Sequence, residues 1–272
     1  MKADVLVAEI GSTTTLINAF CGIRSGEPKF IGQGQAPTSV LEGDVRIGLN
    51  GAIEDLKANL GADKIEYGEM LATSSAAGGL RMCVHGLVYD MTVKAAEAAA
   101  LGAGAIVTMA TAGKLSEYDI EDLKEAKPNL ILLAGGTDYG EKETALFNAR
   151  MIAASGVKAP VIYAGNVQNK RAVEDIFQKA GISCTVTENV YPKLDKLNIE
   201  PARKIIHQVF EEHIIKAPGM EHIRDMVTGH IMPTPGAVME AVQLAYNEIG
   251  DVVAVDLSLI HISEPTRLLS IS

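Results

Sequence analysis

VLVAEIGSTTTLINAF, residues 5–20, is the stretch of this sequence that decides the fold. Two apolar runs flank a carboxylate, a glycine and a row of hydroxyl side chains. Strand-like runs joined by a short turn of small residues are typical of a β-hairpin. The stretch therefore predicts two antiparallel strands, and it raises the question of why a glutamate and several hydroxyls lie at their junction.

The junction has the groups that a phosphate site needs. Glycine lets the backbone approach a ligand closely, and N–H and hydroxyl groups donate hydrogen bonds to phosphate oxygens. Glu9 could hold Mg²⁺ through water, since that ion keeps much of its hydration shell. The segment is not a P-loop, because no Gly-Lys-Ser/Thr follows. On spacing alone, an ordinary hairpin turn with β-favouring threonines explains it equally well. The candidate phosphate-binding residues are Gly11, Ser12, Thr13, Thr14 and Thr15.

Beyond Pro128 the chain alternates between apolar runs and helical segments. Strands are expected in NLILLAGG (129–136), APVIYAG (159–165) and ISCTVTENV (182–190), with helices at 142–156 and 169–181 between them. This order implies a parallel sheet covered by helices. Further helices are expected at 44–60, 90–101, 200–215 and 236–250, and further strands at 105–110 and 251–256. The sequence therefore predicts an α/β protein.

A second candidate site follows the first of these parallel strands. The carboxyl end of such a strand is the usual ligand position in open α/β sheets. Gly135 and Gly136 would permit close approach, and Thr137 and Asp138 could bind a polar ligand, which need not be the nucleotide. In the alternative interpretation, Asp138 only interacts with the start of the following helix. We favour a binding site, because turn chemistry alone does not need two glycines.

The other polar candidates are interpreted as structural. ATSSAAGGLR (72–81) could bind an anion, but tight packing explains its small residues equally well and is preferred. His85 has no metal-ligand partner at a useful spacing. His207 and His213 are six residues apart, not the four that bring two ligands to one helix face.

Composition excludes several classes of protein. The net charge is −10 and aromatic residues make up 4% of the chain, with no Trp, so nucleic-acid and anionic-membrane binding are not expected. No apolar run approaches the roughly 20 residues that span a bilayer. Three separated cysteines suit a reducing compartment. These properties indicate a soluble, cytoplasmic protein.

Five ordered motifs connect these features to a known family. Together, over about residues 4–256, they resemble the glutamate-mutase-associated accessory family. That family is often labelled MutL or GlmL and is unrelated to the mismatch-repair protein of the same name. The first motif also looks like the first phosphate loop of the superfamily of actin-like, heat-shock and sugar-kinase ATPases. The motifs are VAEIGSTTT (7–15), ATSSAAGGLRMCVHGLVYDMTVKAAEAAALGAGA (72–105), LILLAGGTDYG (130–140), APVIYAGN (159–166) and PTPGAVMEA (233–241).

The resemblance implies an actin-like (ribonuclease-H-like) ATPase lobe with an inserted parallel βαβ domain. Residues 1–66 would begin the lobe, 67–228 would form the inserted domain, and 229–256 would start a second lobe. The implied cofactors are ATP and Mg²⁺, with Glu9 near the ion, and no cobalamin is bound directly. The superfamily usually has Asp where this chain has Glu9, so direct catalysis by this residue has no support.

The implied function is that of an ATP-binding accessory protein for an adenosylcobalamin-dependent mutase, such as glutamate mutase or an aminomutase. It would reactivate or chaperone the mutase, whose subunits would be its partners, and the full-length protein would hydrolyse ATP. Two other functions stay open. The protein could be a non-hydrolysing assembly module for the mutase, or a small-molecule kinase of the same superfamily.

The tail after Asp256 differs from the rest of the chain. LSLIHISEPTR (257–267) corresponds to one reading frame of a transposase-based sequencing adapter. The resemblance predicts a second phosphate loop at Asp256, which would make this residue part of the nucleotide site. We therefore expect a truncated, inactive chain that has a non-native tail at 257–272 and binds ATP weakly or not at all. The alternative is a genuine, divergent C-terminal strand and tail.

Overall fold

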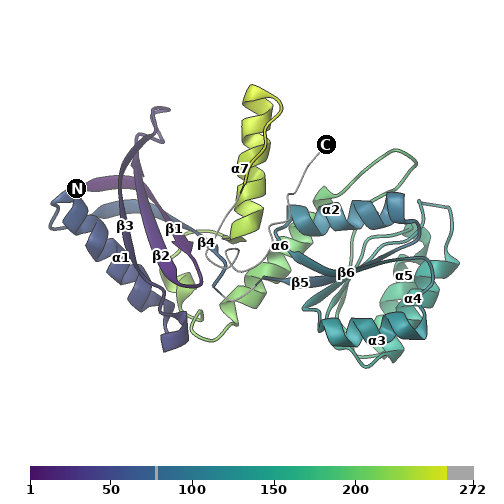
Figure 1. Cartoon of the computed structure of the whole chain (residues 1–272). Coiled ribbons are helices and arrows are strands. Elements are labelled where there is room, and N and C mark those ends of the chain that lie inside the picture. The colour runs from purple at the N-terminus through teal and green to yellow at the C-terminus, as the bar shows by residue number, and fades with distance from the viewer. Residues whose placement is uncertain (77–78, 256–272) are drawn as a thin grey trace.

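The computed structural model describes residues 1–76 and 79–255, which form two five-stranded sheets side by side (Figure 1). In the first sheet the strand order is β10-β4-β1-β2-β3. β1, β2 and β3 pair antiparallel in succession, and β4 runs parallel to both β1 and β10. The hairpin predicted for residues 5–20 is confirmed. The strands are β1 (Lys2–Ile10), β2 (Thr14–Cys21), β3 (Lys29–Pro37), β4 (Glu66–Ser74) and β10 (Ile231–Pro233).

Helix α1 (Val45–Leu60) covers one face of the first sheet. It begins where the Asp44 side chain accepts a hydrogen bond from the Arg46 N–H, and it ends at Gly61 in the left-handed conformation. Strand β3 lies directly against it. A Cβ at Gly34 would stand 2.2 Å from the carbonyl oxygen of Ala52. Only glycine therefore permits this approach of strand and helix.

The second sheet is entirely parallel, in the order β6-β5-β7-β8-β9. Counted along the chain, this order is 2-1-3-4-5, one of the common doubly wound arrangements. The parallel sheet predicted for residues 130–190 is confirmed. Its strands are β5 (Arg81–Gly86), β6 (Ile106–Ala112), β7 (Leu130–Leu133), β8 (Val161–Tyr163) and β9 (Cys184–Val186).

Helices cover both faces of this sheet. One apolar cluster joins α3, α4 and α5 to one face, and another joins α2 and α6 to the opposite face. The helices that lie within residues 130–190, α4 and α5, thus share one face. The other face is covered from outside that segment. The helices are α2 (Lys94–Gly102), α3 (Glu117–Ala126), α4 (Glu143–Ala154), α5 (Lys170–Lys179) and α6 (Glu200–Ile215).

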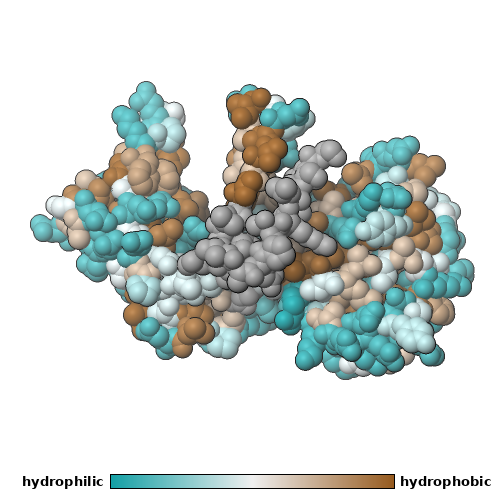
Figure 2. All heavy atoms as spheres, in the orientation of Figure 1, coloured by the Kyte–Doolittle hydropathy of each residue, from teal (hydrophilic) through white to brown (hydrophobic). Residues whose placement is uncertain are grey.

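The two sheets share a continuous apolar core, because the cluster that contains α2 and α6 also contains the buried side chains of the first sheet. The last helix, α7 (Thr234–Ile249), projects away from both sheets (Figure 1). Apolar side chains lie along it in Figure 2, and Leu244 and Ile249 are 66% and 74% exposed. None of the helices within residues 1–76 and 79–255 has the length and apolar character needed to cross a membrane.

Two sequence-based expectations need correction. The helix expected at 90–101 begins as α2 at Lys94, after one π-helical turn at Tyr89–Val93. The strand expected at 251–256 is wrong for residues 251–255, which form no strand. A strand needs a neighbour for its N–H and C=O groups, and these residues pair with no described strand. Asp256 and the tail at 257–272 lie outside the described residues.

Candidate functional site

Three parallel strands of the first sheet end level with one another. Ile10 of β1 is in register with Ser74 of β4, and Ser74 is in register with Pro233 of β10. The carboxyl ends of parallel strands are where open α/β sheets usually bind ligands. The turn of the β1–β2 hairpin follows Ile10 directly, so it lies at this edge.

The turn presents hydrogen-bond donors at its exposed tip. The N–H of Gly11 donates to the carbonyl of Thr14 over 3.0 Å, and a Cβ at Gly11 would lie 2.8 Å from that oxygen. Ser12, Thr13 and Thr14 are exposed. Within the described part of the chain, the N–H groups of Ser12 and Thr13 donate to no protein acceptor. The tip of the hairpin therefore offers both backbone and hydroxyl donors to an anionic ligand.

Thr15 differs from the other three hydroxyl residues, because its side chain is buried. Its Oγ1 lies 2.9 Å from Oγ1 of Thr38, which follows β3. The Thr38 hydroxyl donates to the carbonyl of Gly11 over 2.9 Å, and its N–H donates to the carbonyl of Thr13 over 2.9 Å. Thr15 and Thr38 thus hold the turn from behind. Thr38 has no sequence signal of its own, since it is 23 residues from its partner.

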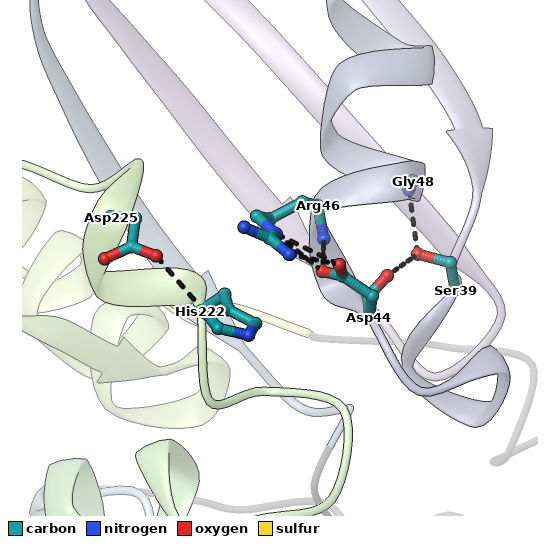
Figure 3. Close-up of polar contacts among 6 residues, drawn as sticks. All are labelled: Ser39, Asp44, Arg46, Gly48, His222 and Asp225. Carbon is teal, nitrogen blue, oxygen red and sulfur yellow. Dashed lines mark hydrogen bonds and ion pairs between the residues drawn. The ribbon is translucent and has the colours of Figure 1, made fainter.

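The chain directly after Thr38 is hydrogen-bonded to the start of α1 (Figure 3). Next to Thr38, the Ser39 hydroxyl donates to the carbonyl of Asp44 over 2.6 Å and accepts from the N–H of Gly48 over 2.8 Å. Hydrogen bonds from the Arg46 side chain, and then from its backbone N–H, lower the pKa of Asp44 to about 2. The carboxylate therefore stays ionised at the helix start, where negative charge is stabilised.

Glu9 is half-buried, one residue before the end of β1. Its neighbours in the sheet are Leu16 and Thr73. Among the described residues, no group of three or more His, Cys, Asp or Glu side chains could hold a metal ion. A Mg²⁺ ion here would therefore rest on one carboxylate and on water, which is a common arrangement for this ion.

The small-residue loop after β4 reaches the same edge. The N–H of Ser75 donates to the carbonyl of Ile10 over 3.0 Å, and the Ser74 hydroxyl lies 3.4 Å from the same oxygen. The sequence favoured a packing role for this loop. Its position beside the turn makes Ser75 a further candidate, and the two consecutive serines after an apolar strand are the signal that could have indicated it.

The loop at residues 135–138 lies on the other sheet and does not join this edge. A Cβ at Gly135 would lie 3.1 Å from Cβ of Ala145, and one at Gly136 would lie 2.7 Å from the carbonyl oxygen of Glu141. Close packing thus accounts for both glycines. Thr137 and Asp138 are half-buried.

Asp138 links three loops. Its Oδ1 accepts from the N–H of Val167 over 2.9 Å and from the Asn189 amide over 3.1 Å. Val167 begins the 3₁₀ turn Val167–Asn169 that leads into α5. Asp138 therefore interacts with the start of a more distant helix, not with α4, the helix that follows it.

His85 lies in the core of the second sheet. Its Nδ1 is 2.7 Å from Oγ1 of Thr111, and its Nε2 has no partner among the described residues. Burial lowers the pKa of His85 to about 4, so the ring is neutral at pH 7. This environment agrees with a structural histidine.

Comparison with known proteins identifies the family of this chain. A family model described as MutL protein matches residues 5–258. The chain belongs to the MutL family. Protein MutL of Clostridium tetanomorphum is 44% identical over 225 residues, which are 80% of this chain and 49% of that protein. This MutL-family chain thus spans about half the length of that curated relative.

Solved structures are only distantly similar. The alignment with a nucleotide-free acetone carboxylase covers 91% of this chain and 35% of the carboxylase chain, at 17% identity and a TM-score of 0.35. The alignment with a glycerol dehydratase reactivase covers 68% of this chain and 30% of the reactivase chain, at 12% identity and a TM-score of 0.19. Similarity at these TM-scores does not define the fold of this MutL-family chain.

Proposed function

We propose that this MutL-family chain carries the first phosphate loop of an ATP-binding accessory protein for an adenosylcobalamin-dependent mutase. The observation that carries the proposal is the hairpin turn at the carboxyl edge of the first sheet. It combines a required glycine, N–H groups with no acceptor among the described residues, exposed hydroxyls and a carboxylate one residue before the end of the strand. These are donors for phosphate oxygens and one acceptor for a hydrated Mg²⁺.

Each residue has a separate role in this proposal. Ser12, Thr13 and Thr14 donate to the phosphates, and Gly11 gives the tight turn. Thr15 supports the turn from the core. Glu9 orients water on Mg²⁺, and the bound nucleotide supplies the phosphoanhydride whose hydrolysis would drive the accessory function. Asp256, which lies outside the described residues, would contribute a second phosphate loop.

The domain organisation belongs to the same proposal. Residues 1–66 begin an actin-like lobe, 67–228 form an inserted domain, and 229–256 start a second lobe. An insertion is supported because the whole second sheet lies in the chain between β4 and β10, which are neighbours in the first sheet. Residues 67–74 of β4 and 231–233 of β10 themselves belong to the first sheet. We propose a mutase as the partner because the chain belongs to the MutL family and its motifs resemble those of accessory proteins of glutamate mutase.

The test replaces Thr13 and Thr14 together by valine in the full-length protein. Valine keeps the β-propensity and approximate volume of threonine and removes only the hydroxyl donors. We expect ATP affinity, measured by calorimetry, to fall at least tenfold, since each hydrogen bond to a charged group contributes roughly 1.5–3 kcal/mol. Replacing the exposed Thr185 of β9 by valine is the control. Unchanged ATP affinity in the double variant would refute the assignment.

Hydrolysis separates the possible activities. ATP turnover that increases when the mutase is added supports an accessory ATPase. Binding without turnover indicates an assembly module, and phosphate transfer to a small molecule indicates a kinase.

A further inference from the structure

A hollow of about 360 Å³ lies at the carboxyl edge of the second sheet. It is formed by the loops that follow β7, β8 and β9. Ligand pockets in proteins commonly have volumes of roughly 300–1,000 Å³, and the carboxyl edge is where doubly wound sheets bind small molecules. The polar side chains that line it are Asp138, Lys170, Glu188, Asn189, Lys196 and Asn198.

Buried asparagines fix the loops around this hollow. Asn166 is 0% exposed, and its side chain accepts from the N–H groups of Tyr139 and Gln168 and donates to the carbonyls of Gly140 and Glu141. These bonds hold Tyr139 at a φ of 62°, in the left-handed region that bulky residues rarely adopt. Backbone held in this region is characteristic of preorganised binding loops.

Asn189 and Asn169 add to the same framework. The Asn189 amide donates to the carbonyl of Gly136 over 3.0 Å as well as to Asp138, and its oxygen accepts from the N–H of Tyr191. The Asn169 amide donates to the carbonyl of Lys142 over 2.8 Å. The walls of the hollow are therefore set before any ligand arrives, which reduces the entropy cost of binding.

The charged groups of the lining balance in number but form no ion pairs among the described residues. Two ammonium groups, of Lys170 and Lys196, and two carboxylates, of Asp138 and Glu188, line one hollow. In the described part of the chain, neither lysine side chain forms an ion pair or a hydrogen bond with another residue. Oδ2 of Asp138 and Oε1 of Glu188 likewise have no protein donor there.

The mixed charges of this lining determine which ligand charges it favours. A simple anion would be opposed by the two carboxylates, and a simple cation would be opposed by the two lysines. A molecule that bears both a carboxylate and an ammonium group matches both pairs. We propose that the hollow binds a small zwitterion of the α-amino-acid class, with its carboxylate toward Lys170 and Lys196 and its ammonium toward Asp138 and Glu188. This proposal does not depend on nucleotide binding at the first sheet.

Calorimetric titration of the 272-residue chain tests this proposal. The probes are L-alanine, L-glutamate and L-lysine, with sodium acetate and methylamine as single-charge controls. We expect at least one amino acid to bind with a dissociation constant of 5 mM or tighter, and the two single-charge probes to bind at least tenfold more weakly.

Two variants locate the binding. Lys196→Gln and Glu188→Gln should each weaken binding of that amino acid at least fivefold. Lys193→Gln changes an exposed lysine close to the hollow but outside its lining, and should leave binding unchanged. Circular dichroism confirms that each variant is folded.

Three results would overturn the proposal. They are the absence of binding by all three amino acids at 20 mM, acetate binding as tight as that of the amino acid, and equal binding by the Lys196→Gln and Lys193→Gln variants. Loss of ATP binding in the Thr13/Thr14 variant without loss of amino-acid binding would bear only on the proposed function.

Discussion

Replacing Asn166 by alanine tests how much of the second sheet's stability comes from one buried side chain. Asn166 makes four hydrogen bonds to backbone groups, at 3.2 Å to Tyr139 N, 3.0 Å to Gln168 N, 3.2 Å to Gly140 O and 3.1 Å to Glu141 O. A typical internal hydrogen bond contributes a net 0.5–1.5 kcal/mol, so the four together contribute about 2–6 kcal/mol. Asn166→Ala should therefore lower the free energy of unfolding by about that amount.

The effect should also be local. Without the amide, nothing among the described contacts holds the N–H of Tyr139, and the residue can leave its left-handed conformation. Amide exchange in residues 138–142 should accelerate, while exchange in the first sheet should stay as in the wild type.

Urea unfolding followed by circular dichroism gives the free energy, and hydrogen exchange by mass spectrometry gives its location. The control is Asn59→Ala, which removes two hydrogen bonds from an exposed asparagine on α1 and should cost less than about 1 kcal/mol. An Asn166→Ala protein within 1 kcal/mol of wild type, with unchanged exchange at 138–142, would show that this network contributes little to stability or order.

Three further changes probe other parts of the chain. Gly34→Ala should cost at least about 3 kcal/mol in urea unfolding, because its Cβ has no room against α1, whereas Gly229→Ala, with 3.7 Å of space, should be nearly neutral. His85→Gln should flatten the pH dependence of stability. The pKa of His85 is about 4 in the native state and 6.5 in the unfolded state, so the unfolded state takes up a proton first as the pH falls. The wild type should therefore lose up to about 1.4 kcal/mol of unfolding free energy per pH unit between pH 6.5 and 4, and His85 should have no effect on stability above pH 6.5. Glu211→Ala should destabilise by about 1–3 kcal/mol, because it removes the buried acceptor of an arginine, a histidine and a backbone N–H, and the exposed neighbour Glu212→Ala should not.

The elements with local signals could be predicted from the sequence. α1 has an aspartate at its start and a glycine in the left-handed conformation at its end, and the alternation after Pro128 fixed the parallel order of β7, β8 and β9. α3 was missed although it carries a capping box between Ser116 and Asp119, a signal that short-range inspection can find.

Strands β3, β4, β5 and β10 were not predicted from the sequence, and β3 and β5 show the physical reasons. β3 (Lys29–Pro37) contains two glycines and sits at a sheet edge, and glycine lowers β-propensity. Its position depends on close packing against α1, which only the folded chain provides. β5 (Arg81–Gly86) is short and contains arginine and histidine, yet it is an interior strand of its sheet, between β6 and β7. The burial of His85 there is a tertiary effect.

The candidate sites likewise contain parts that local sequence indicates and parts that only the folded chain brings together. The turn at Gly11–Thr14 was visible in the sequence because its strand, glycine and hydroxyls are consecutive. Its supports at Thr38 and Ser75 are distant in sequence, and so are the hydrogen bonds that join Asp138 to Val167 and Asn189. Asparagine in a loop gives no indication of whether its side chain faces solvent or crosses to another loop.

The topology limits how the two sheets can influence each other. The chain leaves the first sheet at the end of β4 and returns to it at β10, and these two strands are neighbours. On the return path, Glu211 near the end of α6 accepts from the N–H of Ile231, the first residue of β10, and from the side chains of Arg224 and His230. These contacts would transmit a shift of α6 to β10, whose other end lies level with the hairpin turn. If a ligand at the second sheet affects the proposed phosphate site, residues 216–231 should change their hydrogen exchange, and Glu211→Ala should weaken that response while leaving both binding affinities in isolation unchanged.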